Sequence, residues 1–138
     1  MNEDFILSTD KSKLDLDVIH NYLSNHAYWA KGRSMETVKK SVENSICIGI
    51  YDTVGKQVAF ARFLTDFVVI GYIMDVFVLP EHRSKGLGKR LIEFIVKHED
   101  HKNLKRFILG TQDAHDLYRQ FGFGPLEKPG NWMELKQF

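Results

Sequence analysis

The segment Arg83-Ser84-Lys85-Gly86-Leu87-Gly88 has the residue types that bind phosphate groups, and Lys89 follows it. Apolar residues at helical spacing begin at Leu87, so the segment stands at the start of a predicted helix. A helix start presents unpaired N–H groups and the positive end of the helix dipole, which both favour an anion. Gly86 and Gly88 allow the backbone to approach such a ligand closely, and the basic side chains add positive charge. The sequence therefore predicts a phosphate-binding loop.

Two familiar phosphate motifs do not fit this loop. A Walker A motif needs Gly at the position of Arg83 and Ser or Thr at the position of Arg90. A dinucleotide fingerprint needs Gly or Ala at the position of Leu91. What remains is the pattern Arg/Gln-x-x-Gly-x-Gly/Ala after a strand. A basic helix start without a ligand is the alternative interpretation.

Asp75 is the only charged residue in a long apolar stretch, which runs from Phe67 to Leu79. A buried carboxylate is costly unless it has partners. One interpretation is a structural ion pair with Arg62 or Arg33. The other is a base, acting directly or through water, that takes a proton from an ammonium acceptor, and partial burial would then raise its pKa. The residues leave both interpretations open.

These residues have to be positioned by the strands and helices that the apolar periodicity predicts. Strands are predicted over residues 5–8, 46–51, 57–64, 68–79, 106–111 and 132–136. Helices are predicted over residues 15–24, from 34, over about 86–99 and over 113–121, the last capped by Asp113. This order predicts an α/β fold with a mixed, mostly antiparallel sheet and helices on both faces. The length fits one domain over residues 1–138.

A second segment, residues 114–123, reads Ala-His-Asp-Leu-Tyr-Arg-Gln-Phe-Gly-Phe. It resembles the signature Ala-x-x-Leu-Tyr-x-x-x-Gly-Phe of the GNAT superfamily of acyl-CoA-dependent N-acyltransferases. The loop at residues 83–88 resembles the pyrophosphate loop of the same superfamily. The resemblance covers the order of motifs from about Ile46 to the end of the sequence. Two residues depart from the family pattern, because Thr111 stands where many members carry Asn and Ser84 stands where Gly is frequent.

The resemblance implies a GNAT-like domain that takes acetyl-CoA as co-substrate. The pyrophosphate would lie on residues 83–89. The pantetheine arm would lie where the strand ending at Leu79 splays from the strand over residues 106–111. There it would pair with backbone groups near Phe77 and Val78 like an added strand.

The resemblance also implies roles in the reaction. A backbone N–H near Val78 would polarise the acetyl carbonyl, and Tyr118 would protonate the departing thiolate. Asp75 would help to deprotonate the amine. For Tyr118 the alternative is a core tyrosine with its hydroxyl at the rim.

The connection over residues 26–33 contains Tyr28, Trp29 and Arg33, in a region that often covers the acceptor site in this superfamily. Trp132 could face the same cleft. An ordinary satellite core is the alternative. Since Arg33 would repel a bare amine, either the acceptor also carries a carboxylate or phosphate, or Arg33 pairs with an acid of the fold.

The resulting hypothesis is an N-acetyltransferase that acts on a primary amine of a small molecule by direct attack and needs no metal. A CoA-binding sensor or interaction module without catalysis, or a protein or peptide N-acetyltransferase, is the alternative. The chain has 19 basic and 18 acidic residues, a balance that argues against nucleic acid as a partner. The apolar stretch is too short for a membrane span, and a single cysteine fits the cytoplasm. A homodimer is left open.

Overall fold

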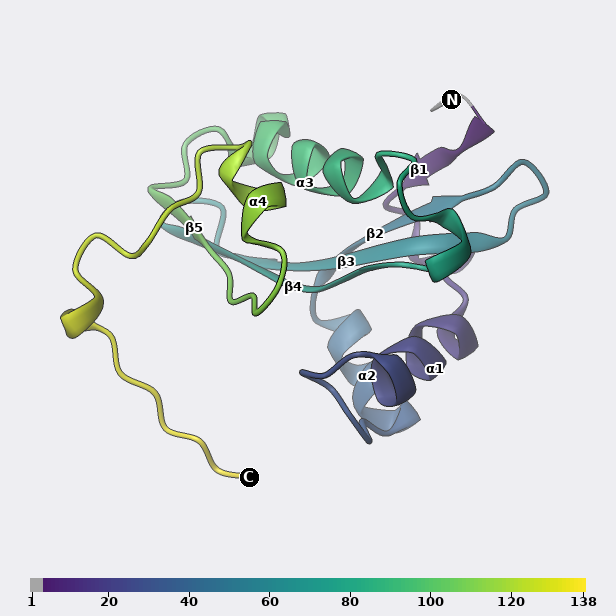
Figure 1. The fold of residues 1–138 in the computed structure, drawn as a ribbon, viewed down its shortest axis with the longest axis horizontal. Helices are drawn as coiled ribbons and strands as arrows, with labels where there is room; N and C mark the ends of the chain where they lie inside the picture. Colours follow the sequence, from purple (N-terminus) through teal and green to yellow (C-terminus); the bar gives the residue numbers. More distant parts are fainter. Residues whose placement is uncertain (1–3) are drawn as a thin grey trace.

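The computed structural model describes residues 4–138, and within them five strands form one mixed sheet (Figure 1). The strands are β1 (Ile6–Ser8), β2 (Ile46–Tyr51), β3 (Gln57–Thr65), β4 (Ile70–Val78) and β5 (Arg106–Ile108), and they lie side by side in sequence order. The first four strands are antiparallel to their neighbours, and β5 runs parallel to β4. The mixed, mostly antiparallel sheet predicted from the sequence is confirmed.

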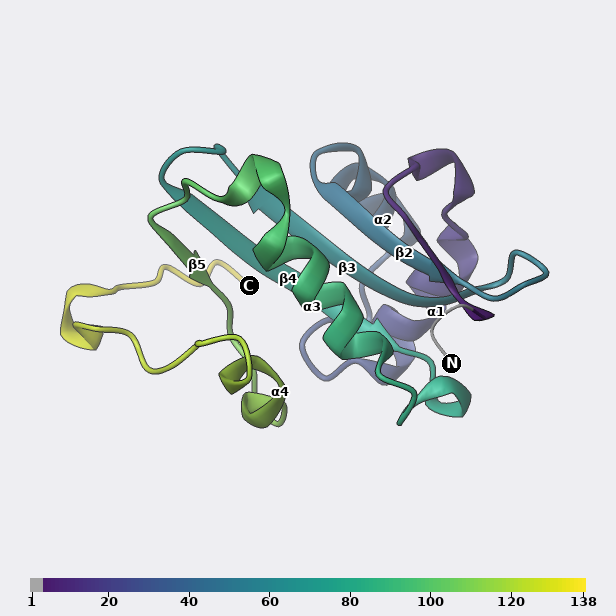
Figure 2. The ribbon, with the colours of Figure 1, turned by 90° about the horizontal axis from the view of Figure 1, so that it is seen from above.

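Helices cover both faces of the sheet (Figures 1 and 2). On one face lie α1 (Leu16–His26) and α2 (Met35–Glu43), and on the other lie α3 (Leu87–Lys97) and the short α4 (His115–Arg119). A side-chain oxygen caps each of the first two helices, because Asp15 accepts a hydrogen bond from Val18 N and Ser34 accepts one from Thr37 N. None of the helices within residues 4–138 has the length and apolar character needed to cross a bilayer.

The core forms one layer on each face of the sheet. Phe63, Leu91 and Ile95 are buried in the layer beneath α3. Phe60 and Leu23 are buried in the layer beneath α1 and α2. Since β3 contributes to both layers, its apolar run is nearly continuous instead of alternating.

β4 contains one extra residue opposite β3. Phe77 pairs with Phe60 and Met74 pairs with Arg62, so β4 has two residues where β3 has one. Asp75 lies at this bulge with a φ of 53°, a left-handed conformation that is uncommon outside glycine. As a result, Met74 Sδ and Asp75 Oδ2 both contact the guanidinium of Arg62.

β4 and β5 pair over only a short distance. Their pairing runs from Ile70–Arg106 to Tyr72–Ile108. Beyond it, residues 73–78 of β4 have no partner strand on that side in the described part of the chain. One edge of β4 is therefore open, as the expected splay requires.

Three predicted elements differ in the structure. The strand predicted over residues 132–136 is wrong, because that segment pairs with no strand in the part described. The predicted helix over residues 113–121 shortens to α4, and Asp113 does not cap it. Instead, Thr111 Oγ1 accepts a hydrogen bond from Ala114 N at 3.1 Å. β5 likewise ends at Ile108 and not at Thr111.

Candidate active site

A cavity of about 680 Å³ lies where β4 and β5 diverge. It is lined by residues 72–76 of β4, residues 109–114 after β5, Tyr118 of α4, and Tyr28, Trp29 and Arg33 of the connection between α1 and α2. Five residues singled out from the sequence, far apart along the chain, therefore meet in one cavity: Tyr28, Trp29, Arg33, Asp75 and Tyr118. Tyr72 and Gln112 also line it, and no sequence motif pointed to them.

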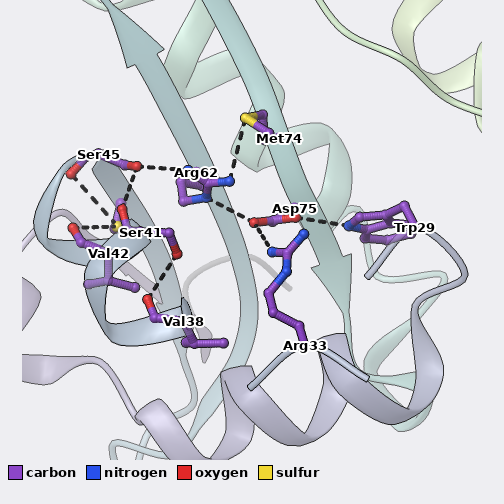
Figure 3. A network of polar contacts seen from close by, with 10 residues as sticks. Trp29, Arg33, Val38, Ser41, Val42, Ser45, Arg62, Met74 and Asp75 are labelled. Carbon is purple, nitrogen blue, oxygen red and sulfur yellow. Dashed lines mark hydrogen bonds and ion pairs between the residues drawn. The ribbon is translucent and has the colours of Figure 1, made fainter. Parts of the chain in front are cut away.

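The carboxylate of Asp75 is fully engaged by three donors (Figure 3). Its Oδ1 accepts a hydrogen bond from Trp29 Nε1 at 2.9 Å. Its Oδ2 accepts from Arg33 Nη1 and from Arg62 Nε, each at 2.8 Å. Because Arg62 also donates to Ser45 Oγ at 3.0 Å, the network ties β4 to β3 and to the end of α2.

This network bears on both interpretations of Asp75. Burial alone raises the pKa of its carboxyl group, but Arg33, Arg62 and Trp29 outweigh burial and lower the pKa below its ordinary value. The raised pKa expected for a base is therefore wrong, and the expected ion pairs with Arg33 and Arg62 are both present. Arg33 pairs with an acid of the fold, so it does not face the cavity as an isolated cation.

Tyr118 is buried on α4 beside the same cavity, and only 7% of its surface is exposed. Its hydroxyl donates to and accepts from no other residue between 4 and 138. Burial, followed by the proximity of Tyr28 and Asp113, raises the pKa of Tyr118 to about 12. The phenol therefore stays protonated near neutral pH and has a free hydrogen to offer to a ligand.

The aromatic connection covers the cavity from the side of α1. The rings of Tyr28 and Trp29 meet edge to face, with centroids 5.0 Å apart, and both are about half exposed. Tyr28 Oη also accepts a hydrogen bond from Gln112 N at 2.7 Å, which joins this connection to the segment after β5. Trp132 does not line the cavity, contrary to expectation, because it packs on the guanidinium of Arg106 instead.

The predicted phosphate loop has the backbone of an anion site. Ser84 and Gly86 have positive φ values of 65° and 78°, and α3 follows directly. The first helical hydrogen bond runs from Arg90 N to Gly86 O. The N–H groups from Ser84 to Lys89 donate to no other residue that the structure describes, so six consecutive donors are available.

The loop adjoins the cavity walls. A Cβ placed on Gly88 would lie 3.6 Å from Leu117 Cδ2 and 3.8 Å from Val78 Cγ2. The start of α3 therefore packs between the end of β4 and α4, the helix that carries Tyr118. An extended ligand could span both sites.

Two of the three cations expected at the loop are held by other parts of the chain. Arg83 donates to Tyr22 Oη at 2.7 Å and to Val78 O at 3.2 Å. Lys85 Nζ lies 5.4 Å from the centre of the Phe5 ring. Tyr22 lies in the helix predicted over residues 15–24, and nothing in the sequence predicted its contact with Arg83.

The backbone of β4 turns Val78 toward the open edge. Leu79 N donates to Val58 O, and hydrogen-bonded pairs alternate along an antiparallel ladder. The N–H and C=O of Phe77 therefore face β3, whereas those of Val78 face the open edge. Of the two backbone positions expected to meet a ligand, only Val78 directs its N–H and C=O away from β3. The ring of Phe77 is buried and stacks on Tyr22.

Known proteins resemble the chain in sequence. The profile described as the acetyltransferase (GNAT) family matches residues 16–123. A Gibberella zeae protein with an acetyltransferase name is 30% identical over 134 residues, which span 83% of this chain and 76% of that protein. The thialysine N-epsilon-acetyltransferase of Sus scrofa is 29% identical over 69 residues, which span 47% of this chain and 41% of that protein.

Solved structures resemble it in fold. A crystal structure from Xanthomonas campestris pv. campestris, assigned to the GNAT family, superimposes with a TM-score of 0.92 at 42% identity and covers 96% of this chain and 92% of that one. A Mycobacterium tuberculosis protein crystallised in complex with CoA superimposes with a TM-score of 0.73, covering 88% of this chain and 73% of that one. At 17% identity, the second likeness concerns the fold alone.

Proposed function

The chain belongs to the GNAT family of acetyltransferases, and on this premise we propose that it moves an acetyl group from acetyl-CoA to a primary amine of a small molecule. The observation that carries the proposal is a row of six N–H groups, from Ser84 to Lys89, which donate to no described residue and lie beside the open edge of β4. A pyrophosphate fits the first feature, and an extended amide-containing arm fits the second. The CoA complex of the Mycobacterium tuberculosis protein with the same fold supports this assignment.

Acetyl-CoA supplies a thioester whose carbonyl carbon is attacked by the amine nitrogen, with the CoA sulfur leaving as a thiolate. The N–H of Val78 faces the open edge and is placed to donate to the carbonyl oxygen as negative charge develops there. Ser84 to Lys89 hold the pyrophosphate through their backbone. The loop thus binds the pyrophosphate with its backbone N–H groups and not with the side chains of Arg83 and Lys85.

Tyr118 is the proposed hydrogen-bond donor to the leaving sulfur. Its hydroxyl has no partner among residues 4–138, so it can donate without first breaking another hydrogen bond. With a pKa of about 12, the phenol is a weaker acid than an ordinary thiol, whose pKa is about 8.5. Tyr118 therefore stabilises the thiolate by donating a hydrogen bond, and complete proton transfer is not required.

Asp75 acts as a positioning residue in this proposal. Both of its oxygens are occupied by Trp29, Arg33 and Arg62, and its lowered pKa makes it a poor proton acceptor. Its contribution is to hold Trp29 and Arg33 against β4. The amine then loses its proton to water.

The acceptor is proposed to be compact because aromatic rings enclose its end of the cavity. Tyr28, Trp29 and Tyr72 line that end, and aromatic faces attract an ammonium group by roughly 0.5–2 kcal/mol. The Sus scrofa relative supports an amino-acid-like amine, because its name specifies the ε-amine of thialysine. Its match covers 47% of this chain, and the comparison of acceptors described next identifies the amine.

The test compares acceptors directly. The protein is incubated with acetyl-CoA and with small amines, amino-acid-like amines or lysine peptides, and release of free CoA thiol is measured together with the mass of the product. We expect a small or amino-acid-like amine to exceed lysine peptides by about tenfold in kcat/KM. Tyr28→Ala, Trp29→Ala and Arg33→Ala should lower kcat/KM for that amine.

Two results would count against the proposal. A lysine peptide preferred by about tenfold, with all three variants unaffected, excludes a small acceptor. No thiol release with any amine, in a protein that binds acetyl-CoA, excludes acetyl transfer to amines.

A further inference from the structure

The polar network around Asp75 carries more positive than negative charge. Two guanidinium groups, those of Arg33 and Arg62, bond to its single carboxylate. The other partners of Arg62, Ser45 Oγ and Met74 Sδ, are neutral. No second acid pairs with either arginine in the described part of the chain. One net positive charge is therefore left in a largely buried network, and a buried charge without a counter-charge is costly.

Arg33 is the part of this network that a ligand can reach. Its side chain is 19% exposed, whereas those of Arg62 and Asp75 are 9% and 1% exposed. Arg33 also lines the cavity, which Arg62 does not. Only its Nη1 is bonded, to Asp75 (Figure 3), so the N–H groups on Nη2 and Nε have no partner among the residues that the structure describes. A guanidinium with free N–H groups beside a cavity is a site for an anionic group of a ligand.

The size of the unbalanced charge favours a carboxylate over a phosphate. The network has one positive charge to balance, and a carboxylate carries one negative charge. A phosphate monoester carries roughly 1.5 to 2 negative charges at neutral pH, so it would place excess negative charge close to Asp75. The planar fork of a guanidinium also matches the two oxygens of a carboxylate.

Asp113 supplies the opposite charge to the same cavity. It lines the cavity, and it forms no hydrogen bond or ion pair with any residue from 4 to 138. It is not needed as a helix cap, because Thr111 Oγ1 accepts the hydrogen bond from Ala114 N. It lies close enough to Tyr118 to contribute to the raised pKa of that phenol. An unpaired carboxylate near Tyr118 suits an ammonium group that has to approach the thioester.

Arg33 and Asp113 stand on two segments that the structure joins. The hydrogen bond from Gln112 N to Tyr28 Oη, 2.7 Å long, ties the segment after β5 to the connection between α1 and α2. Asp113 follows Gln112 directly, and Arg33 lies in the same connection as Tyr28. One small molecule in this cavity can therefore meet both charged groups.

We propose that the acceptor is an amine that also carries a carboxylate, with Arg33 binding the carboxylate and Asp113 binding the ammonium group. This inference rests on the proposed function, because it names the acceptor class of the same site. It also gives a reason for rejecting peptides. A lysine side chain within a peptide presents the ammonium group alone, because the carboxyl group of that lysine is part of an amide bond.

The test compares ω-amino acids of increasing length with their primary amides, which keep the amine and lose the negative charge. At the best length, the acid should exceed its amide by about tenfold or more in kcat/KM, as loss of a charge-assisted hydrogen bond implies. An aminoalkyl phosphate of the same length separates the two kinds of anion. The amino acid should be preferred to it.

Variants assign the two charged groups. Arg33→Gln should lower the preference for the acid over its amide by about tenfold, and Arg33→Lys should restore part of it, because Lys keeps the charge without the fork. Asp113→Asn should lower kcat/KM for acid and amide alike, since both carry the ammonium group. Arg119→Gln is the matched control. Arg119 also pairs with an acid, Asp116, at 2.8 Å, but it is exposed and lies outside the cavity, so the preference should not change.

Binding measurements separate this inference from the proposed function. Calorimetry with CoA in place of acetyl-CoA measures the affinity for each acid and amide when no transfer can occur. Preferential binding of the acid without thiol release from acetyl-CoA would contradict the proposed function and leave the roles of Arg33 and Asp113 standing.

Four results overturn the inference. The first is equal affinity and equal kcat/KM for acid and amide, or no binding of either. The second is a preference for the acid that Arg33→Gln leaves unchanged. The third is an Asp113→Asn variant with unchanged kcat/KM. The fourth is a preference for the aminoalkyl phosphate, which would contradict the argument from a single unbalanced charge.

Discussion

Tyr28 Oη accepts a hydrogen bond from Gln112 N at 2.7 Å, and this contact joins two segments that lie 84 positions apart. One segment connects α1 to α2, and the other follows β5. Residues of both segments line the cavity. The contact therefore holds two walls of the cavity together.

Tyr28→Phe should raise KM for the acceptor by roughly 2- to 10-fold, as loss of one net hydrogen bond of 0.5–1.5 kcal/mol implies. Binding of acetyl-CoA should not change, because the phosphate loop lies elsewhere. Steady-state kinetics with each substrate varied in turn measure both effects. Tyr72→Phe is the control, since Tyr72 lines the same cavity but its hydroxyl bonds to no residue that the structure describes. Equal effects of the two substitutions would contradict the prediction.

Tyr118→Phe should lower kcat by about 10²-fold or more while acetyl-CoA binding changes little, because only the hydrogen-bond donor to the leaving thiolate is lost. Tyr51→Phe is the matched control. Tyr51 is also a buried tyrosine with a pKa raised to about 12 by burial, and its hydroxyl has no partner in the described residues. It lies outside the cavity, so kcat should be preserved. A Tyr118→Phe variant within about twofold of the wild type would remove Tyr118 from the mechanism.

Gly86→Val should abolish the rise in Tm that acetyl-CoA produces by mass action. A β-branched residue does not tolerate the φ of 78°, so the backbone at the loop would move and displace its N–H groups. Gly55→Val is the control for strain, since Gly55 has a φ of 89° in the β2–β3 turn and open space around it. Both variants should lose about 1–2 kcal/mol of stability. Only the Gly55 variant should retain the ligand-induced rise, as thermal scanning with and without acetyl-CoA would show.

Asp75→Asn should lower the free energy of unfolding by about 3–5 kcal/mol at neutral pH, because Arg62 is left buried without its counter-charge. The pKa of Asp75 is lowered in the folded state, so its contribution is present above the ordinary carboxyl pKa of about 3.9. It is lost as pH falls through the folded pKa. The difference between wild type and variant should therefore be constant near neutral pH and shrink in acid.

Urea unfolding at a series of pH values measures this difference. Asp116→Asn is the control, because Asp116 forms an exposed ion pair with Arg119 that contributes little to stability. A difference between wild type and Asp75→Asn that grows toward acid pH would show that the sign is wrong.

The sequence predicts the sheet, the two helical layers and the phosphate loop because local patterns specify them. Apolar runs between turn residues identify β2 to β4, and glycines before a helix identify the loop. Asp75 was found as a charge in an apolar strand, but its partners Arg62 and Arg33 come from 13 and 42 positions away. No local pattern reports which of them reaches the carboxylate, so the direction of its pKa could not be predicted.

The remaining errors share a physical cause. The segment over residues 132–136 alternates apolar and polar residues as a strand does. A strand also needs a second strand to pair with, and the alternation of one segment does not show whether such a partner exists. The contacts of Tyr28 with Gln112 and of Arg83 with Tyr22 likewise join distant segments. Such contacts depend on how the helices pack on the sheet. The sequence pattern predicts the helices and strands but not this packing.

Because β4 contains one extra residue at Asp75, the number of residues at this point determines how the rest of the strand is oriented. Replacing Asp75 alters one polar network. Deleting one residue at the bulge would instead invert every later position of the strand. Phe77 would move from the layer of α1 to the layer of α3, and the N–H of Val78 would turn from the open edge toward β3. The single extra residue thus determines which side chains of β4 face each hydrophobic layer. It also determines that the N–H of Val78 points to the open edge, where a ligand can reach it.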